Sequence, residues 1–156
     1  MLKIAPKEYE ALRRHGEETY PHECCGMLLG RMDGSVRVVT SIERCVNSAD
    51  SPRTNCIIEP REMVRVHRTG RERGEHVVGF YHSHPDVPAR WSPGDLAGSD
   101  WFGCSEVITS VENGKASITK SYELAGYDED DKRFLDETIE VDSTEVPARG
   151  GVSEVS

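Results

Sequence analysis

Short runs of apolar and β-branched residues, separated by polar turns, recur along the chain and predict strands. The run 77–81, Val-Val-Gly-Phe-Tyr, is apolar throughout and predicts a buried strand. Asn113-Gly114 predicts a hairpin turn between the runs 106–111 and 116–124, and residues 32–35 predict another. The remaining expected strands are a short edge strand at 2–4 and the runs 26–29, 36–39, 54–58 and 134–141.

Helical patterns lie between these runs. The expected helices cover 6–20, 60 to Gly70 or Gly74, and 92–102. The first presents Tyr9, Leu12 and His15 on one face, as a helix packed on a sheet requires. The third has Ser92 at its N-cap and Pro93 at its first position, which are the residues preferred there. Strands interspersed with helices, without strict alternation, predict a mixed β-sheet sandwiched by helices.

Length and charge add a domain boundary to this pattern. A chain of 156 residues suits one domain with one core. The net charge is −9, and residues 126–156 hold 10 acidic and 3 basic residues, so this part contributes −7. We therefore expect a folded domain over 1–141 and a disordered acidic tail over 142–156, which lacks a core pattern. Within the tail, Arg149-Gly150-Gly151 resembles the C-terminus of a ubiquitin-like protein, although chance explains such a match more simply.

Composition also excludes several classes of function. An acidic total argues against a nucleic-acid partner. No apolar run reaches membrane-spanning length and no signal-peptide core is present, so we expect a cytoplasmic protein without membrane contact. Five cysteines without a Cys-x-x-Cys pair indicate neither a disulfide framework nor a zinc finger. Cys24 or Cys25 as a nucleophile is an alternative, but cysteines entering a strand are more often packed as small hydrophobes.

The candidate chemistry lies at the end of the buried strand. His82 and His84 are two residues apart, so their side chains point to the same face of a strand and can converge on one ion. Asp95, on the first turn of the helix after Ser92, is the natural third ligand. Two histidines and one carboxylate leave a coordination position open, which is typical of catalytic zinc. The alternative is plain surface polarity for the histidines and a capping box for Asp95.

These residues match a known motif. His82-Ser83-His84-Pro85, Ser92, Asp95 and the upstream Glu23-Cys24-Cys25-Gly26 resemble the JAMM (MPN+/JAB1) zinc metalloprotease family, in its compact bacterial branch. The resemblance covers most of residues 1–125 and implies an α/β/α sandwich related to the cytidine-deaminase fold. It further implies Zn²⁺ held by His82, His84 and Asp95, Glu23 as general base and then acid, and Ser92 as a donor to the oxyanion.

The resemblance also suggests a substrate. Compact bacterial members are linked to ubiquitin-like sulfur carriers in pathways such as cysteine biosynthesis. We expect hydrolysis of the amide bond after the carrier's C-terminal Gly-Gly, with release of cysteine or a short peptide. Three alternatives remain: a deubiquitinase-like isopeptidase on other conjugates, a small-molecule zinc hydrolase or deaminase, and a non-catalytic scaffold. A zinc deaminase is disfavoured, because the chain has no Pro-Cys-x-x-Cys and so lacks the combined His-x-Glu and Pro-Cys-x-x-Cys pattern of that chemistry. The sequence does not determine the oligomeric state, and a homodimer is one possibility.

Overall fold

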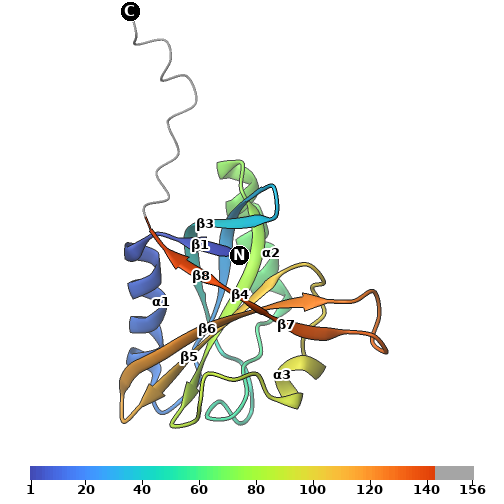
Figure 1. Cartoon of the computed structure of the whole chain (residues 1–156). Helices are drawn as coiled ribbons and strands as arrows, with labels where there is room; N and C mark the ends of the chain where they lie inside the picture. Colours follow the sequence, from blue (N-terminus) through green and yellow to red (C-terminus); the bar gives the residue numbers. More distant parts are fainter. Residues whose placement is uncertain (143–156) are drawn as a thin grey trace, which may run out of the picture.

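The computed structural model describes residues 1–142. Its elements follow the chain in the order drawn in Figure 1. They are β1 (Leu2–Ile4), α1 (Pro6–Thr19), β2 (Cys25–Asp33), β3 (Val36–Cys45), α2 (Pro60–Arg73), β4 (His76–Pro85), α3 (Pro93–Ala97), β5 (Ser105–Glu112), β6 (Lys115–Ala125), β7 (Arg133–Glu137) and β8 (Ile139–Val141). No helix in this part of the chain is long and apolar enough to cross a membrane.

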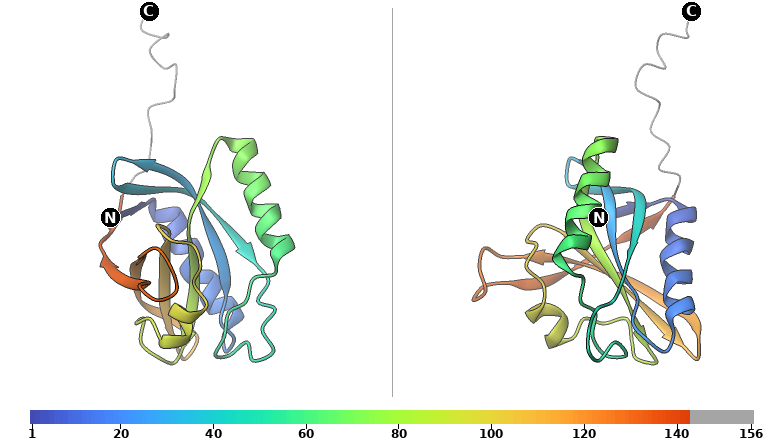
Figure 2. Two further views of the ribbon diagram at one scale, coloured as in Figure 1. Left: turned by 90° about the vertical axis from the view of Figure 1, so that its right-hand side faces the viewer. Right: turned by 180° about the vertical axis from the view of Figure 1, so that it is seen from behind.

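All eight strands of residues 1–142 join one mixed sheet, in the order β7-β6-β5-β4-β2-β3-β1-β8. β4 pairs with β5 in parallel and with β2 in antiparallel orientation, so it lies near the middle of the sheet. Leu12 of α1 packs with Leu28 of β2 in one core cluster. Val66 of α2 packs with Met27 and Leu29, the neighbours of Leu28 on the other face. The predicted mixed sheet with helices on both faces is therefore confirmed (Figure 2).

Local signals placed most elements correctly. α1 buries Leu12 and His15, and Tyr9 packs against the same core, as the spacing predicted. α2 starts at Pro60 and ends before Gly74, whose φ of 68° lies in the left-handed region that glycine tolerates. Asn113 and Gly114 have positive φ values of 50° and 85° and turn β5 into β6.

Two predicted elements are wrong around the cleft described below. Residues 54–58 form no strand. The side chain of Asn47 takes the place of a partner strand: its Oδ1 accepts from Ile57 N at 3.1 Å and its Nδ2 donates to Asn55 O at 2.7 Å. The helix predicted to extend to Phe102 ends at Ala97. None of its residues is buried, so little packing stabilises a longer helix there.

The predicted last strand, 134–141, is also wrong as a single unit. β7 pairs with β6 at one end of the sheet, and β8 pairs with β1 at the other end, with Thr138 between them. β1 is consequently an interior strand and not the expected edge strand. One segment reaches both ends because the sheet curls. The buried guanidinium of Arg37 on β3 spans the curled sheet to Glu123 and Glu137, both at 2.6 Å.

The predicted tail falls almost entirely outside the described residues. Asp142 still belongs to the fold, since its N–H donates to Ile4 O at 3.0 Å. Residues 143–156, with Arg149-Gly150-Gly151, lie outside the part of the chain that the structure describes.

Candidate metal centre

Two histidines project from the same face of a central strand. His82 and His84 are both buried on β4, and their Nε2 atoms lie 3.1 Å apart. Their Nδ1 atoms face away from each other toward acceptors: His84 Nδ1 donates to Pro88 O at 2.8 Å, and His82 Nδ1 donates to Glu106 Oε1 at 2.5 Å. With the proton held on each Nδ1, both Nε2 lone pairs are free to bind an ion.

Asp95 completes the group from the first turn of α3. Its Oδ1 lies 3.2 Å from His82 Nε2, and its Oδ2 lies 3.2 Å from His84 Nε2. Ser92 and Asp95 form the capping box that the sequence suggested: Ser92 Oγ accepts from Asp95 N at 3.1 Å, and Asp95 Oδ2 accepts from Ser92 N at 2.9 Å. Capping and ligation are therefore not alternatives here, because the cap holds the carboxylate toward the histidines.

The three side chains fit a metal ion. One ligand atom from each of His82, His84 and Asp95 lies within 4.8 Å of the other two. The surroundings favour positive charge: burial acts to lower the pKa of His82, but its hydrogen bonds with Asp95 and Glu106 raise it well above the ordinary value. Burial acts to raise the pKa of Asp95, but its hydrogen bonds with His82 and His84 have the larger combined effect and lower that pKa well below its ordinary value. Two imidazoles and a carboxylate are a donor set that zinc accepts.

Glu23 lies beside this group. It precedes β2 at the predicted junction between loop and strand and is 5% exposed. Its backbone is fixed, because its N–H donates to Pro52 O at 2.8 Å and its carbonyl accepts from Asn47 Nδ2 at 3.0 Å. Burial raises the pKa of the Glu23 carboxyl to about 7, while His82 and His84 act in the opposite direction. A carboxyl with this pKa can both take and give a proton near neutral pH.

A cleft of about 280 Å³ opens next to the histidines. His82, Ser92 and Asp95 line one part of it, and the segments 54–58 and 98–101 form its sides. Its apolar lining includes Ile57, Ile58, Met63, Phe80, Trp101 and Phe134. This volume suits an extended segment of a few residues and is far too small for a folded domain.

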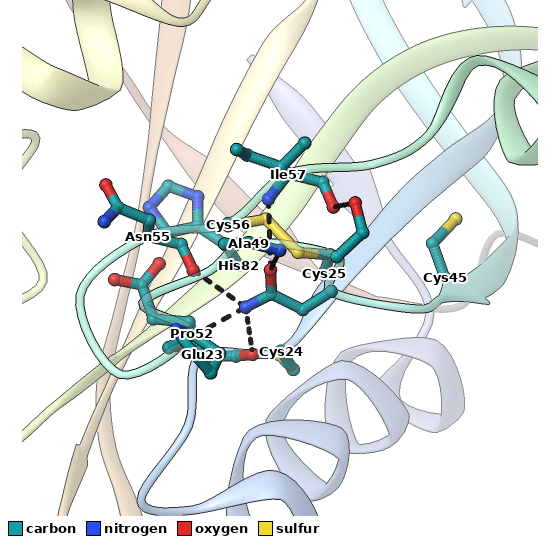
Figure 3. The surroundings of a disulfide bond; sticks show 12 residues. Glu23, Cys24, Cys25, Cys45, Ala49, Pro52, Asn55, Cys56, Ile57 and His82 are labelled. Atoms are coloured by element: carbon teal, nitrogen blue, oxygen red, sulfur yellow. Dashed lines mark hydrogen bonds between the residues drawn. A yellow bond between two sulfur atoms is a disulfide. The ribbon is translucent and has the colours of Figure 1, made fainter.

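A disulfide joins Cys25 to Cys56, with Cα atoms 6.0 Å apart, so the expectation of no disulfide is wrong (Figure 3). Cys25 lies opposite His82 in the β2–β4 register, and Cys56 lies in the cleft-lining segment. The pairing joins parts of the chain 31 residues apart, which no local pattern reveals. It also weakens the thiol-nucleophile alternative: Cys25 is paired, and burial raises the pKa of the Cys24 thiol to about 12.

The structure thus brings together Ser92, Asp95 and both histidines, with Glu23 at their side. Sequence reasoning missed Glu106, Asn47 and the Pro88 carbonyl. Glu106 could have been noticed, since it is the one acid at the start of the apolar run 106–111 in the printed sequence. Asn47 acts on Glu23, which lies 24 residues away in the chain, and no local pattern reveals that contact. Pro88 lies only four residues after His84, but it acts through its backbone carbonyl, which its residue type does not reveal.

One family model and several known proteins are similar to this chain. Residues 6–124 match the family described as prokaryotic homologs of the JAB domain. A protein of Haloferax volcanii named "Desampylase" is 32% identical over 115 residues, which cover 71% of this chain and 81% of that protein. A "Probable TtuB-protein conjugate cleaving protease" of Thermus thermophilus is 29% identical over 59% of each chain. A solution structure of a Desulfitobacterium hafniense protein superposes with a TM-score of 0.77 at 28% identity, covering 92% of this chain and 96% of that one.

Proposed function

This chain belongs to the prokaryotic homologs of the JAB domain, and from this premise we propose that it is a zinc-dependent peptidase or isopeptidase. Its proposed substrate is a ubiquitin-like sulfur carrier, cut at the amide bond after the carrier's C-terminal Gly-Gly with release of cysteine or a short peptide. The observation that carries the proposal is the convergence of His82, His84 and Asp95 beside a buried Glu23 at a narrow cleft.

His82, His84 and Asp95 would hold the zinc ion through two Nε2 atoms and a carboxylate. When bound, zinc supplies Lewis acidity, which activates water and polarises a carbonyl. Glu23 takes a proton from the attacking water and later gives it to the leaving amine. Without an ion, burial raises its pKa to about 7, and a nearby Zn²⁺ acts to lower it. Burial thus keeps the pKa closer to the ambient pH, where a group that must accept and release a proton works best.

Ser92 supports the same step through its hydroxyl group. Its Oγ accepts a hydrogen bond from Asp95 N, which leaves the hydroxyl proton free to donate. We propose that it donates to the oxygen of the scissile carbonyl as negative charge develops there. Ser92 would then hold Asp95 in place and stabilise the transition state with one hydroxyl group.

Three observations support a carrier tail as the substrate. The relatives in Haloferax and Thermus carry names of enzymes that act on protein conjugates. The cleft accepts a thin, extended segment, and glycine allows the closest approach of a backbone to the site. The chain between Glu23 and His82 is taken up by β2, β3, α2 and the cleft-lining loop, which leaves no insertion to grip a second ubiquitin. An isopeptidase acting on other ubiquitin-like conjugates is the alternative.

The test compares substrates directly. Zinc-loaded protein is incubated with carrier-Gly-Gly-Cys adducts and with linked diubiquitin, and mass spectrometry follows the products. We expect the adducts to be cut faster, and His82→Ala, which lacks a ligand, to cut neither substrate. Diubiquitin cut faster than every adduct would favour the alternative. Zinc-loaded protein that cuts no conjugate at all would contradict the proposed activity.

A further inference from the structure

The two histidines of the candidate centre are held by different kinds of group. Pro88 holds His84 through a backbone carbonyl, which no substitution removes. Glu106 holds His82 through a side-chain carboxylate at 2.5 Å. The hydrogen bond that anchors His82 therefore depends on the amino acid at position 106, and a single substitution there can remove it.

Glu106 reaches His82 along the strand pair. β4 and β5 run in parallel with Phe80 opposite Glu106 and His82 opposite Ile108. Residues two apart share a face, so the side chains of His82 and Glu106 project to the same side of the sheet. The His82 side chain is 4% exposed and that of Glu106 is 16% exposed, so little water competes for this hydrogen bond.

The contacts of the Glu106 carboxylate indicate that it orients the His82 ring. Within residues 1–142, its hydrogen bond and ion pair are with His82 alone. It contacts Nδ1, whereas Asp95 and His84 face Nε2 on the far side of the ring. Glu106 is therefore placed to orient the ring and cannot reach the ion position as a fourth ligand without leaving His82.

We propose that Glu106 is the positioning residue that makes His82 a metal ligand. The carboxylate keeps the proton on Nδ1, directs the Nε2 lone pair toward Asp95 and His84, and increases the electron density that the imidazole offers to the ion. The proposal rests on the proposed function only in taking zinc as the bound ion; it concerns how tightly the site holds that ion.

The experiment measures zinc affinity by competition with a chromophoric chelator. The variants are Glu106→Ala, which removes the acceptor, and Glu106→Gln, whose amide oxygen can still accept from Nδ1. Glu112→Gln is the matched control, because Glu112 is an exposed glutamate at the other end of β5. Co²⁺ absorption reports the ligand field in each variant, and melting of the metal-free proteins reports folding.

Loss of such a partner typically weakens metal binding by about 10–100-fold, so we expect this loss for Glu106→Ala, a smaller one for Glu106→Gln and none for Glu112→Gln. The Co²⁺ spectrum should change in the alanine variant and recover partly in the glutamine variant. Unchanged zinc affinity in Glu106→Ala, or equal losses in both Glu106 variants, would overturn the proposal. Failure of the unmodified protein to bind zinc would overturn the proposed function as well, so the two failures are distinguishable.

Discussion

Replacing Ser92 tests whether one hydroxyl has both roles that the geometry permits. As an N-cap, Ser92 accepts a hydrogen bond on Oγ from Asp95 N at 3.1 Å, and its backbone N–H donates the reciprocal bond to Asp95 Oδ2 at 2.9 Å. Removing a serine cap costs about 1 kcal/mol of stability. In a domain of this size, 1 kcal/mol corresponds to a fall in melting temperature of about 2–4 °C.

As an oxyanion donor, the same hydroxyl would contribute more. Losing one such donor lowers kcat by about 10²–10³, which corresponds to about 2.7–4 kcal/mol in the transition state. We therefore expect Ser92→Ala to lose about 1 kcal/mol of stability and at least about 100-fold in kcat. The loss in kcat is larger than the stability cost of the cap, because about 1 kcal/mol corresponds to less than about tenfold in a rate.

Ser92→Gly separates the two roles. Glycine at an N-cap costs only a few tenths of a kcal/mol relative to serine, yet it lacks the hydroxyl as alanine does. If the hydroxyl acts on the substrate, both variants lose kcat equally while their melting temperatures differ. If Ser92 acts only by holding Asp95, the glycine variant keeps most of its kcat. Steady-state kinetics on zinc-loaded protein, with zinc content and melting measured in parallel, decide between them, and a glycine variant with near-normal kcat would refute our reasoning.

Three further predictions follow from the site and the core. His82→Ala, His84→Ala and Asp95→Ala should each lose most bound zinc, since three ligands hold the ion; elemental analysis showing full zinc in all three would contradict the ligand assignment. Glu23→Gln should keep its zinc but lose about 10²–10⁴ in kcat, which kinetics and zinc content together can check. Burial lowers the pKa of His15 from 6.5 to about 4. Between these pH values the unfolded chain binds a proton at His15 and the folded chain does not. As the pH falls through this range, His15 therefore lowers the free energy of unfolding by up to about 3 kcal/mol. Urea unfolding at pH 7.5 and 4.5 should show that His15→Asn loses correspondingly less stability on acidification, whereas equal losses would show that His15 is protonated in the fold.

Features with a local cause were predictable from the sequence. The histidines share a face because strand side chains alternate, and Asp95 faces them because Ser92 and Pro93 set the start of a helix. Pro60 and Gly74 likewise bound α2 through their own backbone preferences. Each of these signals acts over a few residues, so tertiary contacts did not need to be known.

Features that depend on distant contacts were not predictable. The run 54–58 has strand-like residues, but Asn55 O and Ile57 N bond the Asn47 side chain, and Cys56 pairs with Cys25. The run 134–141 is likewise apolar enough for one strand, yet it divides at Thr138, because the curled sheet offers pairing partners at both ends. In both cases tertiary structure overrode a correct reading of local preference.

The pKa of Glu23 shows how these distant contacts create the proposed chemistry. Glutamate ordinarily loses its proton well below neutral pH, and burial is the largest cause of the shift to about 7. That burial depends on the loop before α2: Pro52 and Asn47 fix the Glu23 backbone, and Cys56 ties the same loop to Cys25, two residues after Glu23. The motif therefore supplies the carboxyl, but the loop supplies the pKa that suits it to proton transfer.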